Sequence, residues 1–120
     1  MSFCWTTIHV RNMESSLAFY RDVVGLPLQS RRPAGPGTEL AFLGNGETKL
    51  ELIASAAEPN PGVGSGISTG FTVDSADMAM ERMKTKGIAI ESGPFSPGPD
   101  LTFFFVKDPD GWLVQFVEMK

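Results

Sequence analysis

The sequence contains few of the residues that form crosslinks or carry catalysis. Its 120 residues include one cysteine, one histidine, one tyrosine and two tryptophans. A single cysteine, Cys4, excludes an internal disulfide and favours a reducing compartment. A chain of this length can bury enough surface to fold as one domain without such a crosslink.

Positive charge and long apolar runs are scarce as well. Ten Lys and Arg residues stand against 14 Asp and Glu residues, giving a formal net charge of −4. The basic groups at 31–32 and 84–86 are too small for a nucleic-acid-binding stripe. No stretch approaches the roughly 18 apolar residues of a membrane span, and the N-terminus lacks the pattern of a signal peptide. We therefore expect a soluble cytoplasmic protein with no nucleic-acid or membrane partner.

The first half of the chain begins with a strand followed by a helix. Residues 3–10 are rich in β-branched and aromatic residues, which favour a strand. Asn12 suits a helix N-cap, and Gly25 suits the left-handed residue that ends a helix. Between them, apolar residues recur at helical spacing at Met13, Leu17, Tyr20 and Val24.

Three further strands are predicted before the middle of the chain. A short strand at 27–31 is followed by a Pro/Gly loop at 32–37. Strands at 39–43 and 49–53 flank Asn45-Gly46. Asn-Gly predicts a tight hairpin because both residues tolerate positive φ.

The same pattern starts again after a linker rich in Ala, Pro, Gly and Ser at 54–66. Val10 in the first half matches Val73 in the second, an offset of 63 residues. The second copy is predicted to begin with a strand at 68–73, followed by a helix that Ser75 caps and Gly87 ends. The apolar face of this helix consists of Ala76, Ala79, Met80 and Met83. A strand at 88–91, a loop at 93–100 and strands at 101–106 and 112–117 are predicted to follow. A repeat at fixed offset indicates duplication. We predict one domain, 1–120, built from module 1 (about 1–56) and module 2 (about 66–120).

The segment Asp108-Pro109-Asp110-Gly111 is interpreted as a tight surface turn. Proline fixes φ at the second position, and glycine accepts the positive φ at the fourth. Two carboxylates are too few for a Ca²⁺ loop, so we expect a structural role.

The tandem β-α-β-β-β pattern resembles the vicinal oxygen chelate superfamily, which includes glyoxalase I, bleomycin-resistance proteins and extradiol dioxygenases. Residues 10–26, VRNMESSLAFYRDVVGL, and residues 107–112, KDPDGW, carry the resemblance, which extends over nearly the whole chain. It implies an α+β fold in which the two modules form a curved mixed sheet around a cleft, with helices on the outside. It also implies a homodimer.

The resemblance further implies four metal-ligand positions, on the first and last strand of each module. In this sequence they are Trp5, Glu51, Ser68 and Gln115. Divalent metals prefer imidazole and carboxylate donors, and only Glu51 provides one. We therefore expect no metal ligands and no cofactor. The alternative is a divalent metal held by Glu51 with other ligands, among them His9.

Strand alternation predicts which side chains face the cleft. Trp5, Thr7 and His9 share one face, whereas Cys4 points toward the helix layer. If Leu50 and Leu52 face the helix, then Glu51 faces the cleft together with Lys49 and Ile53.

Each cleft residue has two interpretations. His9 is either a ligand-contacting base or hydrogen-bond donor, or a strand histidine bonded to a neighbour. Glu51 is either a proton-transferring group or the partner of Lys49 or an arginine in an ion pair. Trp5 either stacks on a conjugated ligand or fills the cavity.

The predicted ligand-binding residues are Trp5, Thr7, His9, Lys49, Glu51, Ser68, Thr72, Phe103, Phe105, Leu113 and Gln115. This mostly apolar lining with a few polar groups suits a small organic molecule. We predict a metal-independent, glyoxalase/bleomycin-resistance-like protein that binds an aromatic or conjugated ligand between its modules. The alternatives are a metal-dependent lyase, isomerase or dioxygenase using Glu51, a metal-free enzyme using Glu51 or His9, and an interaction module with a filled cavity. Whether the chain is an enzyme stays open at this point.

Overall fold

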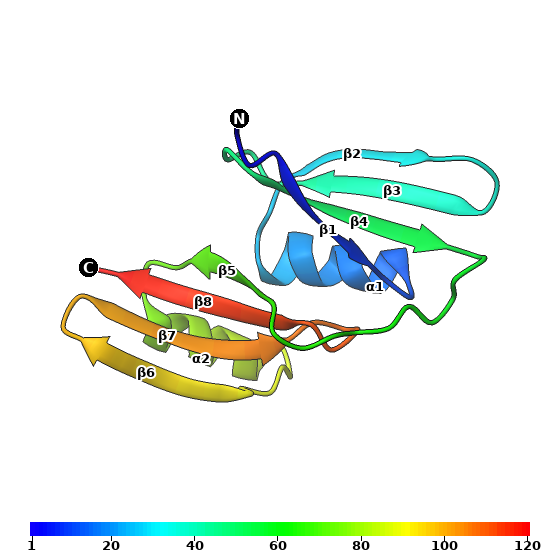
Figure 1. The fold of residues 1–120 in the computed structure, drawn as a ribbon. Helices are drawn as coiled ribbons and strands as arrows, with labels where there is room; N and C mark the ends of the chain where they lie inside the picture. The colour runs from blue at the N-terminus through cyan, green and yellow to red at the C-terminus, as the bar shows by residue number, and fades with distance from the viewer. The chain divides into compact units, whose positions relative to one another are not determined.

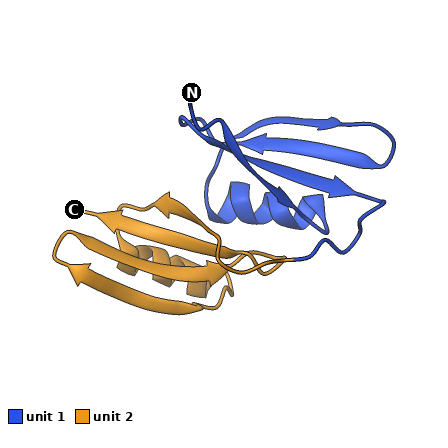
Figure 2. Ribbon diagram, viewed as in Figure 1, with its two compact units in different colours: residues 1–62 blue, residues 63–120 orange.

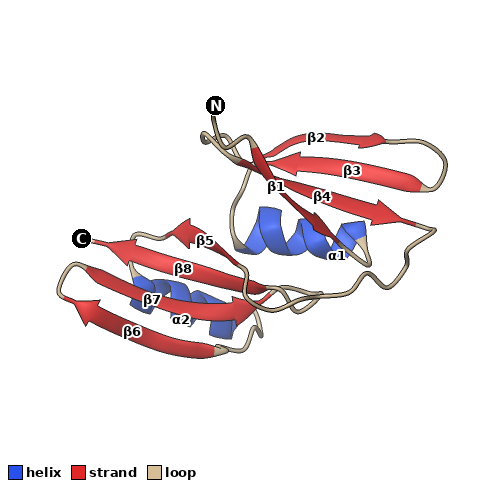
Figure 3. Cartoon of the chain, in the orientation of Figure 1, coloured by secondary structure: helices blue, strands red, loops and turns tan.

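Two mixed sheets of four strands, each with a helix on one face, make up the computed structural model (Figures 1 and 3). The structure describes residues 1–120. The chain divides into two units, residues 1–62 and 63–120 (Figure 2). The predicted α+β class and the tandem β-α-β-β-β order are confirmed.

In the first unit, the outer strand β1 lies parallel to β4, and the remaining strands are antiparallel. The sheet order is β1-β4-β3-β2. The elements are β1 (Trp5–His9), α1 (Met13–Leu17), a π-helical continuation η1 (Ala18–Val23), β2 (Leu28–Pro33), β3 (Thr38–Leu43) and β4 (Lys49–Ser55).

The second unit has the same topology, with the order β5-β8-β7-β6 and a parallel β5–β8 pair. Its elements are β5 (Ser68–Thr72), α2 (Ala76–Thr85), β6 (Ser92–Gly98), β7 (Leu101–Lys107) and β8 (Leu113–Met119). The repeat deduced from the sequence is therefore a repeat of topology.

Each unit has its own core between helix and sheet. Tyr20 and Met83, which match at the 63-residue offset, are both 0% exposed. The buried apolar strand residues alternate along each strand, as packing against a helix on one face requires. They are Ile8, Ala41, Leu43, Leu50 and Leu52 in the first unit and Phe104, Val106, Val114 and Phe116 in the second. Complete burial of side chains such as these contributes roughly 1.5–3 kcal/mol for each large one.

The predicted helix caps and stops are confirmed. The Asn12 side chain accepts a hydrogen bond from Ser15 N at 2.9 Å, and Ser75 accepts one from Met78 N at 3.2 Å. Gly25 and Gly87 end the helices with φ of +91° and +74°. The longest helix, α2, has 10 residues, and no helix is long and apolar enough to cross a membrane.

The first helix differs from prediction because its second part is π-helical. Val24 N donates to Phe19 O at 2.9 Å, five residues back instead of four. The wider turns let Phe19 and Tyr20, which are adjacent in sequence, both reach the core. The 3.6-residue periodicity of an α-helix predicted Tyr20, but not Phe19, to lie on the apolar face.

The prediction of a strand at 88–91 and a loop at 93–100 was wrong. The strand is β6, and it includes Pro94 and Pro97. Proline lacks an N–H and is confined to sheet edges or bulges. Since β6 is the edge strand and pairs irregularly with β7, both prolines are accommodated there.

The turn predicted before β4 was also wrong. Asn45-Gly46 does not form a two-residue hairpin turn, because β3 and β4 are joined by residues 44–48 and the positive φ, +102°, falls on Gly44. Cys4 precedes β1 and is exposed, and its carbonyl accepts a hydrogen bond from Lys49 N at 2.9 Å.

Candidate functional site

Rows of side chains cross the first sheet on the face turned away from its helix, which we call open face 1. Strand register aligns Trp5 with Lys49 in one row, Thr7, Glu51, Phe42 and Ser30 in the next, and His9, Ile53, Leu40 and Arg32 in a third. The five first-unit residues predicted for ligand binding all belong to this face. The expectation that Leu50 and Leu52 face the helix is confirmed, since both are buried.

Glu51 is the buried charge of open face 1. Its residue is only 8% exposed, and Oε1 accepts a 2.5 Å hydrogen bond from the Thr7 hydroxyl. Glu51 forms no ion pair with Lys49 or with an arginine, so that interpretation does not hold. The carboxylate is anchored by a neutral donor, and its second oxygen has no donor from the chain.

Trp5 and Phe42 form an aromatic pair beside this carboxylate. Their ring centroids are 5.4 Å apart at an interplanar angle of 75°, an edge-to-face contact. Trp5 nevertheless remains 49% exposed, so part of the indole is available to a ligand. Sequence reasoning missed Phe42, although its position between the core residues Ala41 and Leu43 placed it on the opposite face.

His9 lies at the far end of β1 on the same face. It is exposed and aligned with Ile53. Its side chain makes no hydrogen bond, so it is not satisfied by a neighbour as one interpretation required.

The corresponding surface of the second sheet, open face 2, carries the other six predicted residues. Register aligns Ser68, Leu113 and Lys107 in one row, Gly70, Gln115, Phe105 and Ser92 in the next, and Thr72, Val117, Phe103 and Phe95 in a third. Phe104, between two open-face phenylalanines, is buried in the core.

Three phenyl rings form a cluster on open face 2. Phe95 lies 5.5 Å from Phe103 and 6.5 Å from Phe105, and the latter two are 5.9 Å apart, measured between ring centroids. Phe95 was missed because its segment was predicted to be a loop. Had the segment been recognised as an edge strand, which tolerates proline, Phe95 would have been predicted to lie on a strand.

The central rows of the two faces correspond to each other. Glu51 lies between Thr7 and Phe42, as Gln115 lies between Gly70 and Phe105. A Cβ added to Gly70 would meet Gln115 Oε1 at 3.4 Å, so the amide lies close to the bare glycine. The first unit therefore has a carboxylate with a hydroxyl donor where the second has a neutral amide without one.

The residues at the implied metal positions do not fit a divalent metal. On open face 1 these positions are Trp5 and Glu51, and on open face 2 they are Ser68 and Gln115. One oxygen of Glu51 is already engaged by Thr7. Nowhere does the chain gather three or more His, Cys, Asp or Glu side chains that could hold a metal ion.

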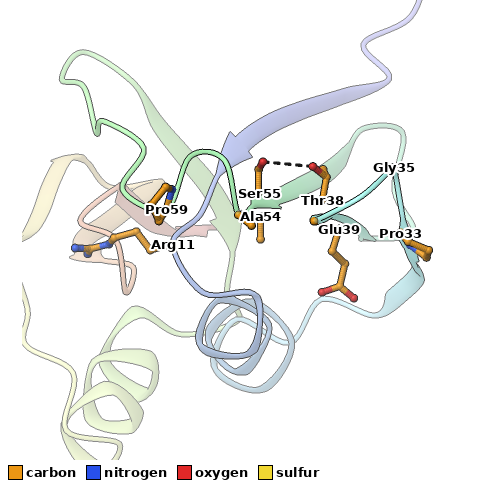
Figure 4. A pocket seen from close by; sticks show the side chains of 10 residues that line it. Arg11, Pro33, Gly35, Thr38, Glu39, Ala54, Ser55 and Pro59 are labelled. Atoms are coloured by element: carbon orange, nitrogen blue, oxygen red, sulfur yellow. Dashed lines mark hydrogen bonds between the residues drawn. The ribbon is translucent and has the colours of Figure 1, made fainter.

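A cavity of about 440 Å³ lies elsewhere in the first unit, where β3 and β4 meet the loop joining β2 to β3 (Figure 4). None of the predicted ligand-binding residues lines it. Its lining consists of Arg11, Pro33, Gly35, Gly37, Thr38, Glu39, Ala54, Ser55, Ala56 and Pro59, and Thr38 and Ser55 share a 3.3 Å hydrogen bond.

An ion-pair network borders this cavity. Arg31 Nε donates to Glu39 Oε2 at 2.5 Å, and its terminal nitrogen donates to Glu14 in α1. Hydrogen bonding to Arg31 lowers the pKa of Glu14, and the two carboxylates raise the pKa of Arg31. These groups are solvent-exposed, so the network connects β2 to α1 with little net stabilisation.

Comparison with known proteins agrees with the resemblance seen in the sequence. Residues 2–116 match the family model of the Glyoxalase/Bleomycin resistance protein/Dioxygenase superfamily. The chain is 36% identical to the lactoylglutathione lyase of Neisseria meningitidis serogroup B, with all of this chain and 92% of that protein covered. It is 31% identical to the lactoylglutathione lyase of Salmonella typhimurium, over all of this chain and 94% of that protein.

Solved structures show the same fold at lower identity. Glyoxalase I of Leishmania major superposes with a TM-score of 0.85 at 21% identity, covering 98% of this chain and 86% of that one. An antibiotic binding protein from Streptomyces superposes with a TM-score of 0.79 at 21% identity, covering 100% of this chain and 97% of that one. With its matched family model, its relatives and its fold in agreement, the chain belongs to the Glyoxalase/Bleomycin resistance protein/Dioxygenase superfamily.

Proposed function

We propose that this protein binds a small aromatic or conjugated organic ligand on open face 1, without a divalent metal. The observation that carries the proposal is the half-exposed indole of Trp5, held edge-on to Phe42 beside the Glu51 carboxylate. Aromatic contacts of this kind contribute roughly 0.5–1.5 kcal/mol beyond simple burial.

Open face 2 supports a ligand of the same class. The Phe95, Phe103 and Phe105 rings form an apolar surface beside one amide, Gln115. Mostly apolar surfaces with a few placed polar groups are typical of small-molecule sites.

Metal independence is supported by the donors at the four implied positions. Tryptophan offers a metal no lone pair, and a neutral serine and glutamine are weak donors for transition metals. One carboxylate is insufficient to hold such an ion against water.

A second candidate is a lactoylglutathione lyase, because relatives at 31–36% identity carry that name. A metal-dependent version would need an ion on Glu51 with ligands beyond those assembled in the chain. A metal-free version would use Glu51 or His9 as a base. Both versions of the lyase require catalytic groups, whereas ligand binding requires only the side chains of open face 1.

A thermal-shift screen of aromatic metabolites and antibiotics, with and without a chelator, tests the first candidate. We expect at least one compound to raise the Tm equally in both conditions. Trp5→Ala should abolish that shift, and Met78→Ala, which removes an exposed side chain from α2, should leave it unchanged.

Metal analysis and an assay for lactoylglutathione formation test the second candidate. Protein purified without chelator should contain far less than stoichiometric metal and should form no lactoylglutathione. A tightly held divalent ion that disappears in Glu51→Gln would contradict the binding proposal and support the metal-dependent lyase. Lactoylglutathione formation that survives chelation would support a metal-free enzyme.

A further inference from the structure

We infer that the ligand of open face 1 carries a protonated nitrogen on its aromatic body, and that Glu51 Oε2 receives this group. The inference rests on the proposed function and narrows it from aromatic ligands to aromatic cations. It comes from the hydrogen bonds that Glu51 lacks.

The chain has two buried carboxylates, and their surroundings differ. Asp108 is 5% exposed, and its Oδ1 accepts hydrogen bonds of 2.9 Å from the backbone nitrogens of Asp110, Gly111 and Trp112. Glu51 is 8% exposed and accepts one, from Thr7. A carboxylate offers about four acceptor sites, so Glu51 retains unused capacity, including all of that on Oε2.

A buried charge with few hydrogen bonds is costly unless a partner compensates it. The cation best placed within the chain is Lys49, two residues away on the same face. It forms no ion pair with Glu51. Glu51 is therefore without a paired cation, and a bound ligand would provide one.

The aromatic neighbours favour the same ligand chemistry. Trp5 and Phe42 border the carboxylate, and the faces of such rings attract cations. An anionic ligand on these two rings would meet the buried carboxylate of Glu51, although Lys49 and Arg32 lie in the neighbouring rows of the same face. Open face 2 has no such carboxylate, because the neutral Gln115 stands where Glu51 does and the charged residue in its rows is Lys107.

Calorimetric titration with three ligands of matched shape tests the inference. They are 1-naphthylmethylamine, which is a cation, 1-naphthalenemethanol, which is neutral, and 1-naphthoate, which is an anion. We expect the amine to bind about tenfold more tightly than the alcohol and the anion to bind most weakly, because the alcohol can donate a hydrogen bond to the carboxylate but only the amine adds a positive charge to it.

Variants of equal net charge show whether Glu51 causes the preference. Glu51→Gln should remove the advantage of the amine over the alcohol. Glu47→Gln is the matched control, because Glu47 is exposed in the 44–48 connection, and it should preserve the preference. The wild-type ranking of the three ligands is a test that needs no variant to fold.

The possible failures are distinguishable. Equal or tighter binding of the alcohol or the anion, abolished by Trp5→Ala, would overturn the charge inference and leave the aromatic-ligand proposal standing. Loss of the preference in Glu47→Gln would also overturn the inference. Binding of none of the three compounds, with no hit in the wider screen, would overturn both.

Discussion

The Thr7 hydroxyl and the Glu51 carboxylate are joined by a 2.5 Å hydrogen bond between neighbouring parallel strands. At the equivalent place in the second unit, Gly70 is aligned with Gln115 and has no side chain to donate. The two copies thus share a backbone register and differ in the polar chemistry built on it. This difference locates the charged part of the candidate site in the first unit.

Thr7→Val should destabilise the protein by about 1 kcal/mol, because it leaves a buried carboxylate oxygen without its donor at nearly constant side-chain volume. Thr7→Ser keeps the hydroxyl and should lose less. Urea denaturation of the three proteins measures the difference. Equal stability of the Val and Ser variants would mean that the hydrogen bond contributes nothing.

Asp108→Ala should destabilise the second unit by roughly 2–3 kcal/mol. The substitution removes the acceptor of three backbone N–H groups in the turn at 108–111. Asp108→Asn retains one oxygen and should be intermediate. Free energies of unfolding from denaturant titration check the order, and an Asn variant less stable than the Ala variant would contradict it.

Gly93→Ala should be more destabilising than Gly25→Ala. Both glycines have positive φ, +102° and +91°, so each substitution carries a backbone penalty of about 1–2 kcal/mol. A Cβ at Gly93 would also approach the Cα of Phe104 to 3.0 Å, whereas nothing lies within 4 Å at Gly25. Overpacking adds about 1–3 kcal/mol at Gly93, and comparison of the two Tm values tests this ranking. An equal decrease in Tm for the two variants would show that β7 moves to accommodate the added Cβ at no cost in stability.

Protonation of Glu118 should make the protein less stable in acid. Its carboxylate accepts a 2.7 Å hydrogen bond from Ala76 N at the start of α2, and this bond, with Lys120 nearby, lowers its pKa below the ordinary 4.5. The folded state therefore binds this proton less readily than the unfolded state, so the stabilisation is present above about pH 4.5 and is lost as the pH falls through the lowered pKa.

Unfolding free energies of wild type and Glu118→Gln, measured from about pH 7 to about pH 3, test this linkage. The wild-type advantage should shrink in the acidic part of the range. A difference between the two proteins that stays constant with pH would contradict the assignment to Glu118.

Much of the framework could be predicted because it depends on local chemistry. Asn12 and Ser75 cap helices through their own side chains, and Gly25 and Gly87 take the positive φ that ends them. Alternation along a strand likewise assigned Glu51 to the face opposite its leucine neighbours. These features need no knowledge of the rest of the chain.

The features that were missed depend on partners distant in sequence. Phe42 became part of the site by pairing with Trp5 across the sheet, and Phe95 by lying on a strand whose composition indicates a loop. The π-helical segment forms because both Phe19 and Tyr20 reach the core, a constraint that helical periodicity alone does not contain.

The edge strand β6 has a consequence for how this protein behaves at high concentration. An uncovered sheet edge with its N–H and C=O groups free can recruit a strand from another molecule and start aggregation. Pro94 and Pro97 remove two of the N–H groups from β6, and its shifted pairing with β7 interrupts the regular ladder. Pro94 and Pro97, which made this segment resemble a loop in the sequence, thus also protect the molecule against polymerising through that edge.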